Sequence, residues 1–181
     1  MISNGIKVIL VLSILLPAVV PSQPPVSVPE TTRAVSVMSG PTDVKGVIVF
    51  ESLGHDWIRV TGSITGLQPG PHGFHVHKLG DLTNGCVSAG EHFNPFRQTH
   101  GGLKSKVRHA GDLGNIVANA EGVAMVDLVA RQMALSGPLS IIGRSIVIHA
   151  DKDDLGLGHE PDSPTTGHSG TRVGCGVIGR S

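Results

Sequence analysis

The sequence predicts an all-β protein, in which eight short antiparallel strands form a sandwich or barrel that carries two long loops. From Arg33 onward, short apolar stretches alternate with turn residues, and no stretch shows a sustained helical period with caps. The chain has 25 glycines and 12 prolines, which favour turns. Aromatic residues make up only 3 %, so valine, isoleucine and leucine must build the core, and these residues suit strands.

The eight strands are expected where apolar residues cluster between turn residues. The sequence Asn-Ala-Glu-Gly at 119–122 is typical of a hairpin turn between two of them. Two segments, 79–110 and 150–172, do not fit the strand spacing and hold several histidines, a cysteine and many charges. We expect them to be functional loops that a metal or a disulfide orders. The expected strands are residues 34–38, 44–51, 57–64, 73–78, 113–118, 123–128, 145–149 and 173–178.

The 181 residues are expected to form one domain behind an N-terminal leader. The apolar run at 6–20 is shorter than the roughly 20 residues of a membrane-spanning helix, and Pro17 interrupts it. Residues 1–22 are therefore predicted to be a secretory signal peptide, with an N-terminal membrane anchor as the alternative. Residues 23–31 are expected to be a proline-rich linker, and residues 32–181 the folded domain. The mature protein would then be secreted and free of the membrane.

The charge balance and the cysteine content indicate which partners and which redox compartment to expect. Lys+Arg and Asp+Glu are both 14, so no basic excess indicates a nucleic-acid partner. The only cysteines are Cys86 and Cys175. An even number in an exported chain favours a disulfide, and two free thiols in a cytosolic protein are the alternative.

The segment Gly73–His77 places two histidines on one face of a predicted strand. Side chains alternate along a strand, so His75 and His77 point the same way while Phe74 and Val76 face the other side. Two imidazoles on one face can chelate one ion. The H-x-H pattern alone is weak evidence, because half-exposed histidines also occur by chance.

Five further metal-binding side chains follow in the long loop and at the end of a later strand. Carboxylate and imidazole together suit a closed zinc site, and imidazoles alone suit Cu(II). Seven such groups on one β scaffold favour a metal centre over scattered surface histidines. The candidate ligands are His75, His77, His92, His100, His109, Asp112 and His149.

Four segments resemble motifs of the copper/zinc superoxide dismutase family, and the resemblance extends over residues 32–181. They are GPHGFHVH at 70–77, GCVSAGEHFNP at 85–95, RHAGDLGN at 108–115 and GCGVIG at 174–179. The resemblance implies an eight-stranded antiparallel Greek-key β-barrel, an immunoglobulin-like sandwich, with two long functional loops. It also implies a disulfide between Cys86 and Cys175.

The same resemblance implies copper and zinc as cofactors. It assigns four histidines to copper: His75, His77, His92 and His149. It assigns four residues to zinc: His92, His100, His109 and Asp112. His92 would thus bridge both ions. Asp153 matches an aspartate that orients one copper histidine and one zinc histidine from outside the coordination spheres.

The implied activity is superoxide dismutation, in which copper alternates between Cu(II) and Cu(I) and zinc is structural. Arg172 matches the arginine that docks the superoxide anion, and His92 the histidine that takes and returns a proton. The alternative is a non-catalytic superoxide-dismutase-like protein that binds copper and zinc or acts as a copper chaperone. The complete copper set and Arg172 argue against it.

The chain departs from the family pattern at several positions. Thr165 stands where a lysine of the guiding loop is expected, and Asp151 adds an acid close to His149. A homodimer is expected by analogy. Its contact is weakened because Leu79 replaces a common aromatic residue and because the last strand ends at Arg180.

The leader should be absent from the mature protein. The short apolar run before a proline-rich segment predicts cleavage, so N-terminal sequencing of secreted material should start between about Val19 and Arg33. An intact Met1 on exported protein would instead indicate a membrane anchor.

Overall fold

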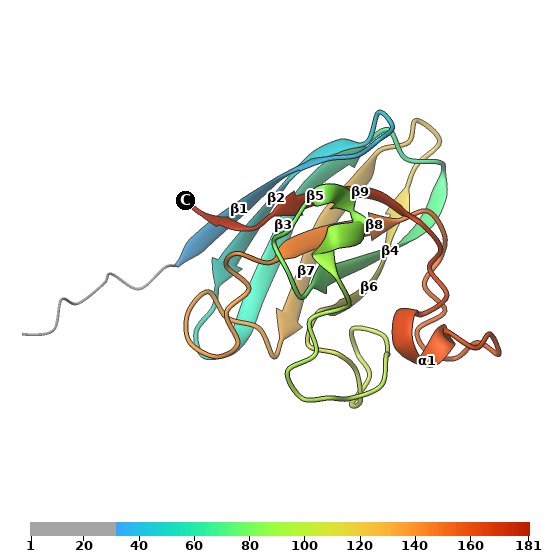
Figure 1. Cartoon of the computed structure of the whole chain (residues 1–181). Helices are drawn as coiled ribbons and strands as arrows, with labels where there is room; N and C mark the ends of the chain where they lie inside the picture. The colour runs from blue at the N-terminus through green and yellow to red at the C-terminus, as the bar shows by residue number, and fades with distance from the viewer. Residues whose placement is uncertain (1–31) are drawn as a thin grey trace, which may run out of the picture.

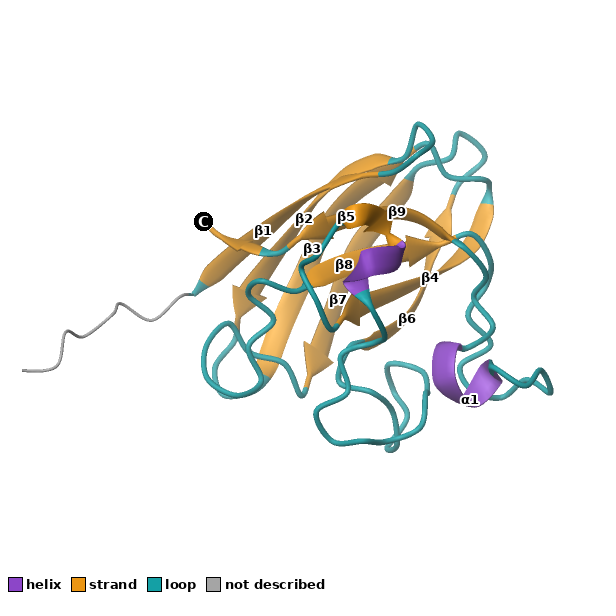
Figure 2. Ribbon diagram, viewed as in Figure 1, coloured by secondary structure: helices purple, strands orange, loops and turns teal. Residues whose placement is uncertain are grey.

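Eight antiparallel strands close into a barrel in the computed structural model, which describes residues 32–181 (Figures 1 and 2). Each predicted strand is present, with ends shifted by a few residues. The predicted signal peptide (1–22) and linker (23–31) lie outside the described residues. The barrel strands are β1 (Arg33–Ser39), β2 (Lys45–Ser52), β3 (Trp57–Thr65), β4 (Gly70–His77), β6 (Asp112–Ala118), β7 (Ala124–Arg131), β8 (Ser145–His149) and β9 (Arg172–Val177).

The strand order confirms the Greek-key topology. Around the barrel the order is β1-β2-β3-β7-β6-β4-β8-β9, and β1 pairs with β9 at Ser39 and Cys175, which closes the sheet. β4 follows β3 in the sequence but lies between β6 and β8, so the connection between β3 and β4 crosses two strands. A two-residue strand, β10 (Gly179–Arg180), pairs with the beginning of β1.

The barrel core is aliphatic, as the composition predicts. Along β1 the burial alternates, with Ala34, Ser36 and Met38 inside and their neighbours more exposed. Strand β4 is different, because every residue from His72 to His77 is buried. Its outer face is covered by the long loops, and this is where buried polar side chains gather.

Two long connections, residues 78–111 and 150–171, cover this outer face, and they touch where the His100 N–H donates to the Pro164 carbonyl at 2.8 Å (Figure 1). They contain three short elements that the sequence did not predict: β5 (Thr83–Cys86), a 3₁₀ turn (Val87–Ala89) and α1 (Ser163–Thr166). Elements of a single turn or of four residues are too short to show a hydrophobic periodicity in the sequence. Among the described residues, no helix is both long and apolar enough to cross a membrane.

The predicted disulfide is present between Cys86, at the end of β5, and Cys175 in β9. It attaches the first long loop to the barrel wall. The two cysteines are 89 residues apart, and closing a loop of that length stabilises the fold by about 4–5 kcal/mol on the chain-entropy model.

The predicted hairpin turn between β6 and β7 is also confirmed. The Gly122 N–H donates to the Asn119 carbonyl at 3.0 Å, and the Asn119 N–H donates to the Val123 carbonyl at 2.9 Å. Gly122 has a φ of +73°, a left-handed conformation that glycine adopts without steric cost.

Candidate metal centre

Strand β4 delivers two histidines to the outer face of the barrel, as its alternation predicts. Phe74 and Val76 point into the hydrophobic core, while His75 and His77 point outward into a buried polar cluster. β4 pairs with β8, whose last residue, His149, joins the same cluster.

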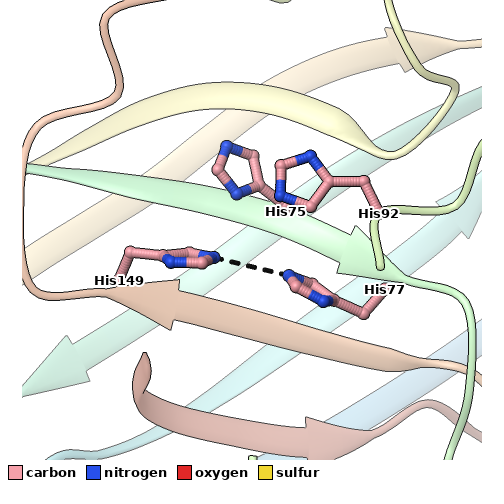
Figure 3. Close-up of side chains that lie close together, drawn as sticks. All are labelled: His75, His77, His92 and His149. Atoms are coloured by element: carbon pink, nitrogen blue, oxygen red, sulfur yellow. Dashed lines mark hydrogen bonds between the residues drawn. The ribbon is translucent and has the colours of Figure 1, made fainter. Parts of the chain in front are cut away.

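The four-imidazole group consists of His75, His77, His92 and His149, and Figure 3 shows their rings facing a common space. One ring nitrogen from each lies within 4.8 Å of the others, and all four residues are buried. His92 comes from the first long loop, which runs antiparallel to β4 where His92 bridges to His77.

Hydrogen bonds determine which nitrogen each ring presents to this space. The Nδ1 atoms of His77 and His149 lie 2.8 Å and 3.2 Å from the Gly90 and Gly170 carbonyl oxygens, so these nitrogens donate. The Nε2 atoms of these two rings are then free to ligate and lie 3.4 Å apart. Figure 3 marks this contact between the two rings.

The remaining two rings each have a buried nitrogen without a hydrogen-bond partner. These atoms are His75 Nδ1 and His92 Nε2. A buried polar atom without a partner is costly in the interior, and a metal ion is the partner that an imidazole lone pair can take. The donor set of the four-imidazole group therefore fits copper, for which imidazole nitrogens are suitable ligands.

The pKa values of this group agree with metal binding. Burial lowers the pKa of His75 and His77 well below the usual range, with further lowering from neighbouring imidazoles. Burial also lowers the pKa of His149 to about 4. These rings are consequently neutral at physiological pH, and a neutral imidazole is the form that ligates a metal.

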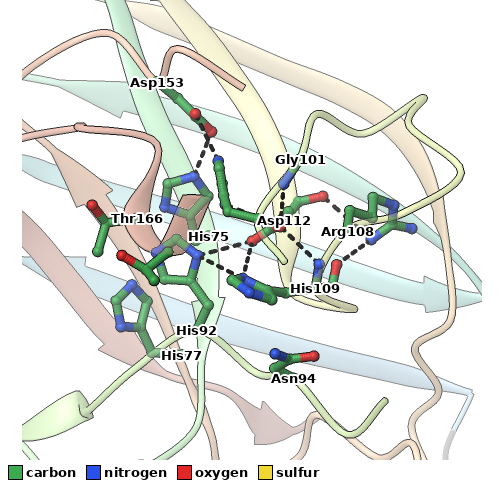
Figure 4. Close-up of polar contacts among 12 residues, drawn as sticks. His75, His77, His92, Asn94, Gly101, Arg108, His109, Asp112, Asp153 and Thr166 are labelled. Atoms are coloured by element: carbon green, nitrogen blue, oxygen red, sulfur yellow. Dashed lines mark hydrogen bonds and ion pairs between the residues drawn. The ribbon is translucent and has the colours of Figure 1, made fainter. Parts of the chain in front are cut away.

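The carboxylate group consists of His92, His100, His109 and Asp112, all of them buried. Asp112 Oδ1 lies 2.8 Å from His92 Nδ1 and 3.1 Å from His109 Nδ1, contacts that Figure 4 marks. Asp112 Oδ2 lies 3.0 Å from His100 Nδ1, outside hydrogen-bond geometry. Three imidazole nitrogens and a carboxylate that converge in this way fit a closed tetrahedral zinc site.

Burial alone would raise the pKa of the Asp112 carboxyl, but the imidazoles of His100, His109 and His92 outweigh it and hold that pKa well below its usual range. Burial opposes protonation of His100, yet the adjacent carboxylates of Asp112 and Asp153 raise the pKa of His100 to about 9. The carboxylate is therefore ionised throughout the physiological range and can supply the negative charge that favours a divalent cation.

Asp153 connects the two groups from outside them. One carboxylate oxygen lies 2.8 Å from His75 Nε2 and the other 2.8 Å from His100 Nε2, so both rings donate to it. Asn115 holds the segment in place, because its amide exchanges two bonds of 2.8 Å with the Asp153 backbone. Gly167 leaves the necessary space, since a Cβ there would overlap the Asp153 carboxylate and His100 Nε2.

Arg108 organises the turn that carries the last two members of the carboxylate group. It is 1 % exposed, and its guanidinium donates to the carbonyls of His109 at 2.7 Å and Ala110 at 3.0 Å. A further bond of 2.7 Å reaches the Arg131 carbonyl at the end of β7. The guanidinium thus fastens this turn to the barrel (Figure 4).

A cavity of about 460 Å³ opens the four-imidazole group to solvent. Arg172 lines it, and its guanidinium donates to the carbonyls of Cys86 at 2.7 Å, Val87 at 3.1 Å and Gly90 at 2.6 Å. The cation is thereby fixed beside the cluster. The other lining residues are Glu91, His92, Asn94, Gln98, Thr99, His109, His149, Pro164, Thr165 and Thr166.

Comparison with known proteins agrees with this geometry. Residues 44–178 match the family described as copper/zinc superoxide dismutase (SODC). The chain is 52 % identical over 151 residues to a protein of Onchocerca volvulus named extracellular superoxide dismutase [Cu-Zn], covering 81 % of this chain and 75 % of the relative. This chain belongs to the copper/zinc superoxide dismutase family.

Every site residue predicted from the resemblance to copper/zinc superoxide dismutases lies in this centre. The structure brings the seven predicted ligands into two groups that share His92, places Asp153 between the groups and sets Arg172 at the cavity. The assignment of these residues to copper, to zinc and to substrate docking is developed below as a proposal.

The sequence analysis assigned no role to three residues that support the centre. They are Arg108, Asn115 and His72, whose ring nitrogens lie 2.9 Å and 2.8 Å from the carbonyl oxygens of His149 and Gln68. All three lie inside the family-like segments 70–77 and 108–115. Proximity to the ligands in sequence is the only signal that could have singled them out, because each of them also binds a partner on a distant strand or loop.

Removing the Asp112 carboxylate should weaken both zinc binding and the fold. Asp112→Ala leaves the imidazoles of His92 and His109 without their acceptor and removes the carboxylate beside His100. Breaking a buried pair of this kind costs about 3 kcal/mol or more. We expect lower zinc content by elemental analysis and a lower unfolding midpoint. Asp43→Ala, at an exposed aspartate remote from the centre, is the control. An Asp112→Ala variant with unchanged zinc content and melting curve would falsify the zinc assignment.

Proposed function

We propose that this chain disproportionates superoxide at a copper ion held by the four-imidazole group, with a zinc ion held by the carboxylate group. The observation that carries this proposal is the sharing of His92, whose Nε2 faces one group while its Nδ1 faces the other. The protein is a secreted copper/zinc superoxide dismutase that uses both metals as cofactors and superoxide as substrate.

When bound, copper supplies one-electron chemistry by alternating between Cu(II) and Cu(I), so that one superoxide is oxidised to oxygen and a second, with two protons, is reduced to hydrogen peroxide. Zinc has no redox role and orders the ligands. The protein must therefore attract a small anion, orient the imidazoles and deliver protons.

His92 is placed to hold a proton close to the substrate. Its Nε2 is buried without a hydrogen-bond partner in the protein and faces the rings of His75 and His77. Its Nδ1 is engaged by the carboxylate group, so a proton at Nε2 is the one that can be exchanged. The ring cannot swing away, because its loop is fastened to the end of β4. His92 would thus take and return a proton at one defined atom.

Arg172 captures the anion. A guanidinium stays charged at physiological pH and keeps donors available after it has bonded to three carbonyls. Neutral imidazoles cannot attract an anion over a distance, so a fixed cation at the cavity supplies the attraction. The three carbonyls keep its position constant.

Asp153 is a positioning residue for both groups. Its two oxygens fix the orientation of His75 and His100, and thus select the nitrogen that each ring turns to the metal. Asn115 and Gly167 support this role of Asp153. Asn115 binds the Asp153 backbone, and Gly167 leaves space for the Asp153 carboxylate.

We further propose that the mature protein, comprising the linker (23–31) and the domain (32–181), is a homodimer free of the membrane. Exposed apolar side chains gather where β9 and the first long loop meet β1. Val37, Leu79 and Val177 are 71 %, 44 % and 41 % exposed, and Gly80 packs against Val177. Arg180, in the short strand beside β1, sets a charge near the end of this face.

Replacing Arg172 should impair anion capture and leave metal binding intact. We expect Arg172→Ile to lower activity about tenfold or more, the effect of losing roughly 1.4 kcal/mol of transition-state stabilisation. Arg172→Glu should be worse, because it repels superoxide, and Arg172→Lys should retain more activity than Ile. Superoxide dismutation assays on metal-loaded protein, with copper and zinc measured in parallel, give the comparison. Full activity of the Glu variant at low ionic strength would show that Arg172 is not the docking cation.

The dimer contact should depend on Leu79. Leu79→Glu places a charge in the apolar face and should convert the protein to monomers in sedimentation equilibrium. Leu157→Glu, at an 80 % exposed leucine of the second long loop, serves as the matched control and should not change the mass. A monomeric wild-type protein would refute the proposed dimer.

A further inference from the structure

Two side chains of opposite charge line the cavity that leads to the four-imidazole group. Apart from histidines, Arg172 and Glu91 are its only charged lining residues within 32–181. Gly90, whose carbonyl accepts a 2.6 Å bond from Arg172, directly precedes Glu91. The backbone that carries Glu91 is therefore bonded to the guanidinium, and both side chains line the same cavity.

The backbone of Glu91 is fixed, and its side chain is free. The Lys78 N–H donates to the Glu91 carbonyl at 2.8 Å, and the next residue, His92, is a member of both metal-binding groups. The Glu91 side chain is exposed and forms no ion pair or hydrogen bond within residues 32–181. Its charge is therefore not neutralised by a partner and acts on whatever enters the cavity.

The second long loop adds no compensating cation to the cavity lining. It contributes Pro164, Thr165 and Thr166 of α1, which are all uncharged. The connection that carries α1, residues 150–171, contains five carboxylates and a single lysine, Lys152. Arg172 thus attracts anions although the second long loop is rich in carboxylates. Glu91 is the carboxylate that lines the cavity itself.

We propose that Glu91 determines which anions reach the metal centre, by lowering the affinity of the cavity for all anions and for dianions more than for monoanions. Electrostatic energy is proportional to the charge of the entering anion. An unopposed Arg172 would favour a dianion, such as sulfate, over a monoanion. The Glu91 carboxylate cancels part of that advantage and shifts the selectivity toward singly charged anions, the class to which superoxide belongs. This inference rests on the proposed function, because the ligand enters the same cavity.

The test compares two anions on the copper- and zinc-loaded enzyme at low ionic strength. Azide serves as the monoanion, with binding followed through the visible absorption of Cu(II), and sulfate serves as the dianion, measured by its competition with azide. Glu91→Gln removes the charge at nearly constant shape. Glu121→Gln makes the same change of net charge in the exposed turn between β6 and β7, far from the cavity, and is the matched control.

We expect Glu91→Gln to bind azide about two- to fivefold more tightly, the size of one unit-charge interaction across a solvated cavity. Sulfate affinity should rise by about the square of that factor, because the anion carries twice the charge. The value of kcat/KM for superoxide should rise with the azide affinity. Glu121→Gln should match the wild type in all three measurements.

Equal shifts for azide and sulfate, or a Glu91→Gln enzyme indistinguishable from Glu121→Gln, would overturn the inference while leaving the proposed function in place. Failure of the proposed function looks different. In that case the metal-loaded wild type would not dismutate superoxide, and azide would not perturb its copper absorption. An unaltered melting curve for Glu91→Gln verifies that the fold is intact, as expected for an exposed side chain.

Discussion

The imidazole of His92 belongs to both metal-binding groups, and much of the surrounding structure holds this one ring in place. Its backbone bridges to His77 at the end of β4. The next residue, Phe93, donates its N–H to the Val76 carbonyl at 2.8 Å and packs into the core. The ring is therefore carried by a segment whose backbone is hydrogen-bonded to strand β4. With both nitrogens facing different groups, a small rotation of His92 would disturb two sites at once.

Burial of the two carboxylates of the centre is tolerated because each has defined partners. An unpaired carboxylate in the interior is very costly, yet Asp112 and Asp153 are completely buried. Imidazoles surround both, and backbone N–H groups of Gly101 and His109 also donate to Asp112. The two loops that supply these partners contain little regular structure. Their order depends on the polar cluster, on the metals that it fits and on the disulfide.

One short segment of the first loop links Arg172, the proposed substrate-binding cation, to the candidate metal centre. Residues 86–92 contain the disulfide cysteine, the carbonyls that hold Arg172, and His92 itself. The geometry between the guanidinium and the imidazoles is therefore determined within seven residues, although Arg172 lies in β9 far along the chain. The Glu91 carboxylate enters the electrostatics of the cavity because it lies inside this segment.

The sequence by itself determined the all-β class, the strands and, through the family resemblance, which residues are the candidate ligands. Alternation in β4 places His75 and His77 opposite Phe74 and Val76, and this is a local property that needs no tertiary information. Only the tertiary structure decided which ring nitrogen each histidine presents, because carbonyls and carboxylates from other segments select it. It also decided the roles of Arg108 and Asn115, whose partners at Arg131 and Asp153 lie on distant segments. The cavity lining combines the negative charge of Glu91 with the positive charge of Arg172. This combination likewise arises only because folding brings the first long loop and β9 side by side.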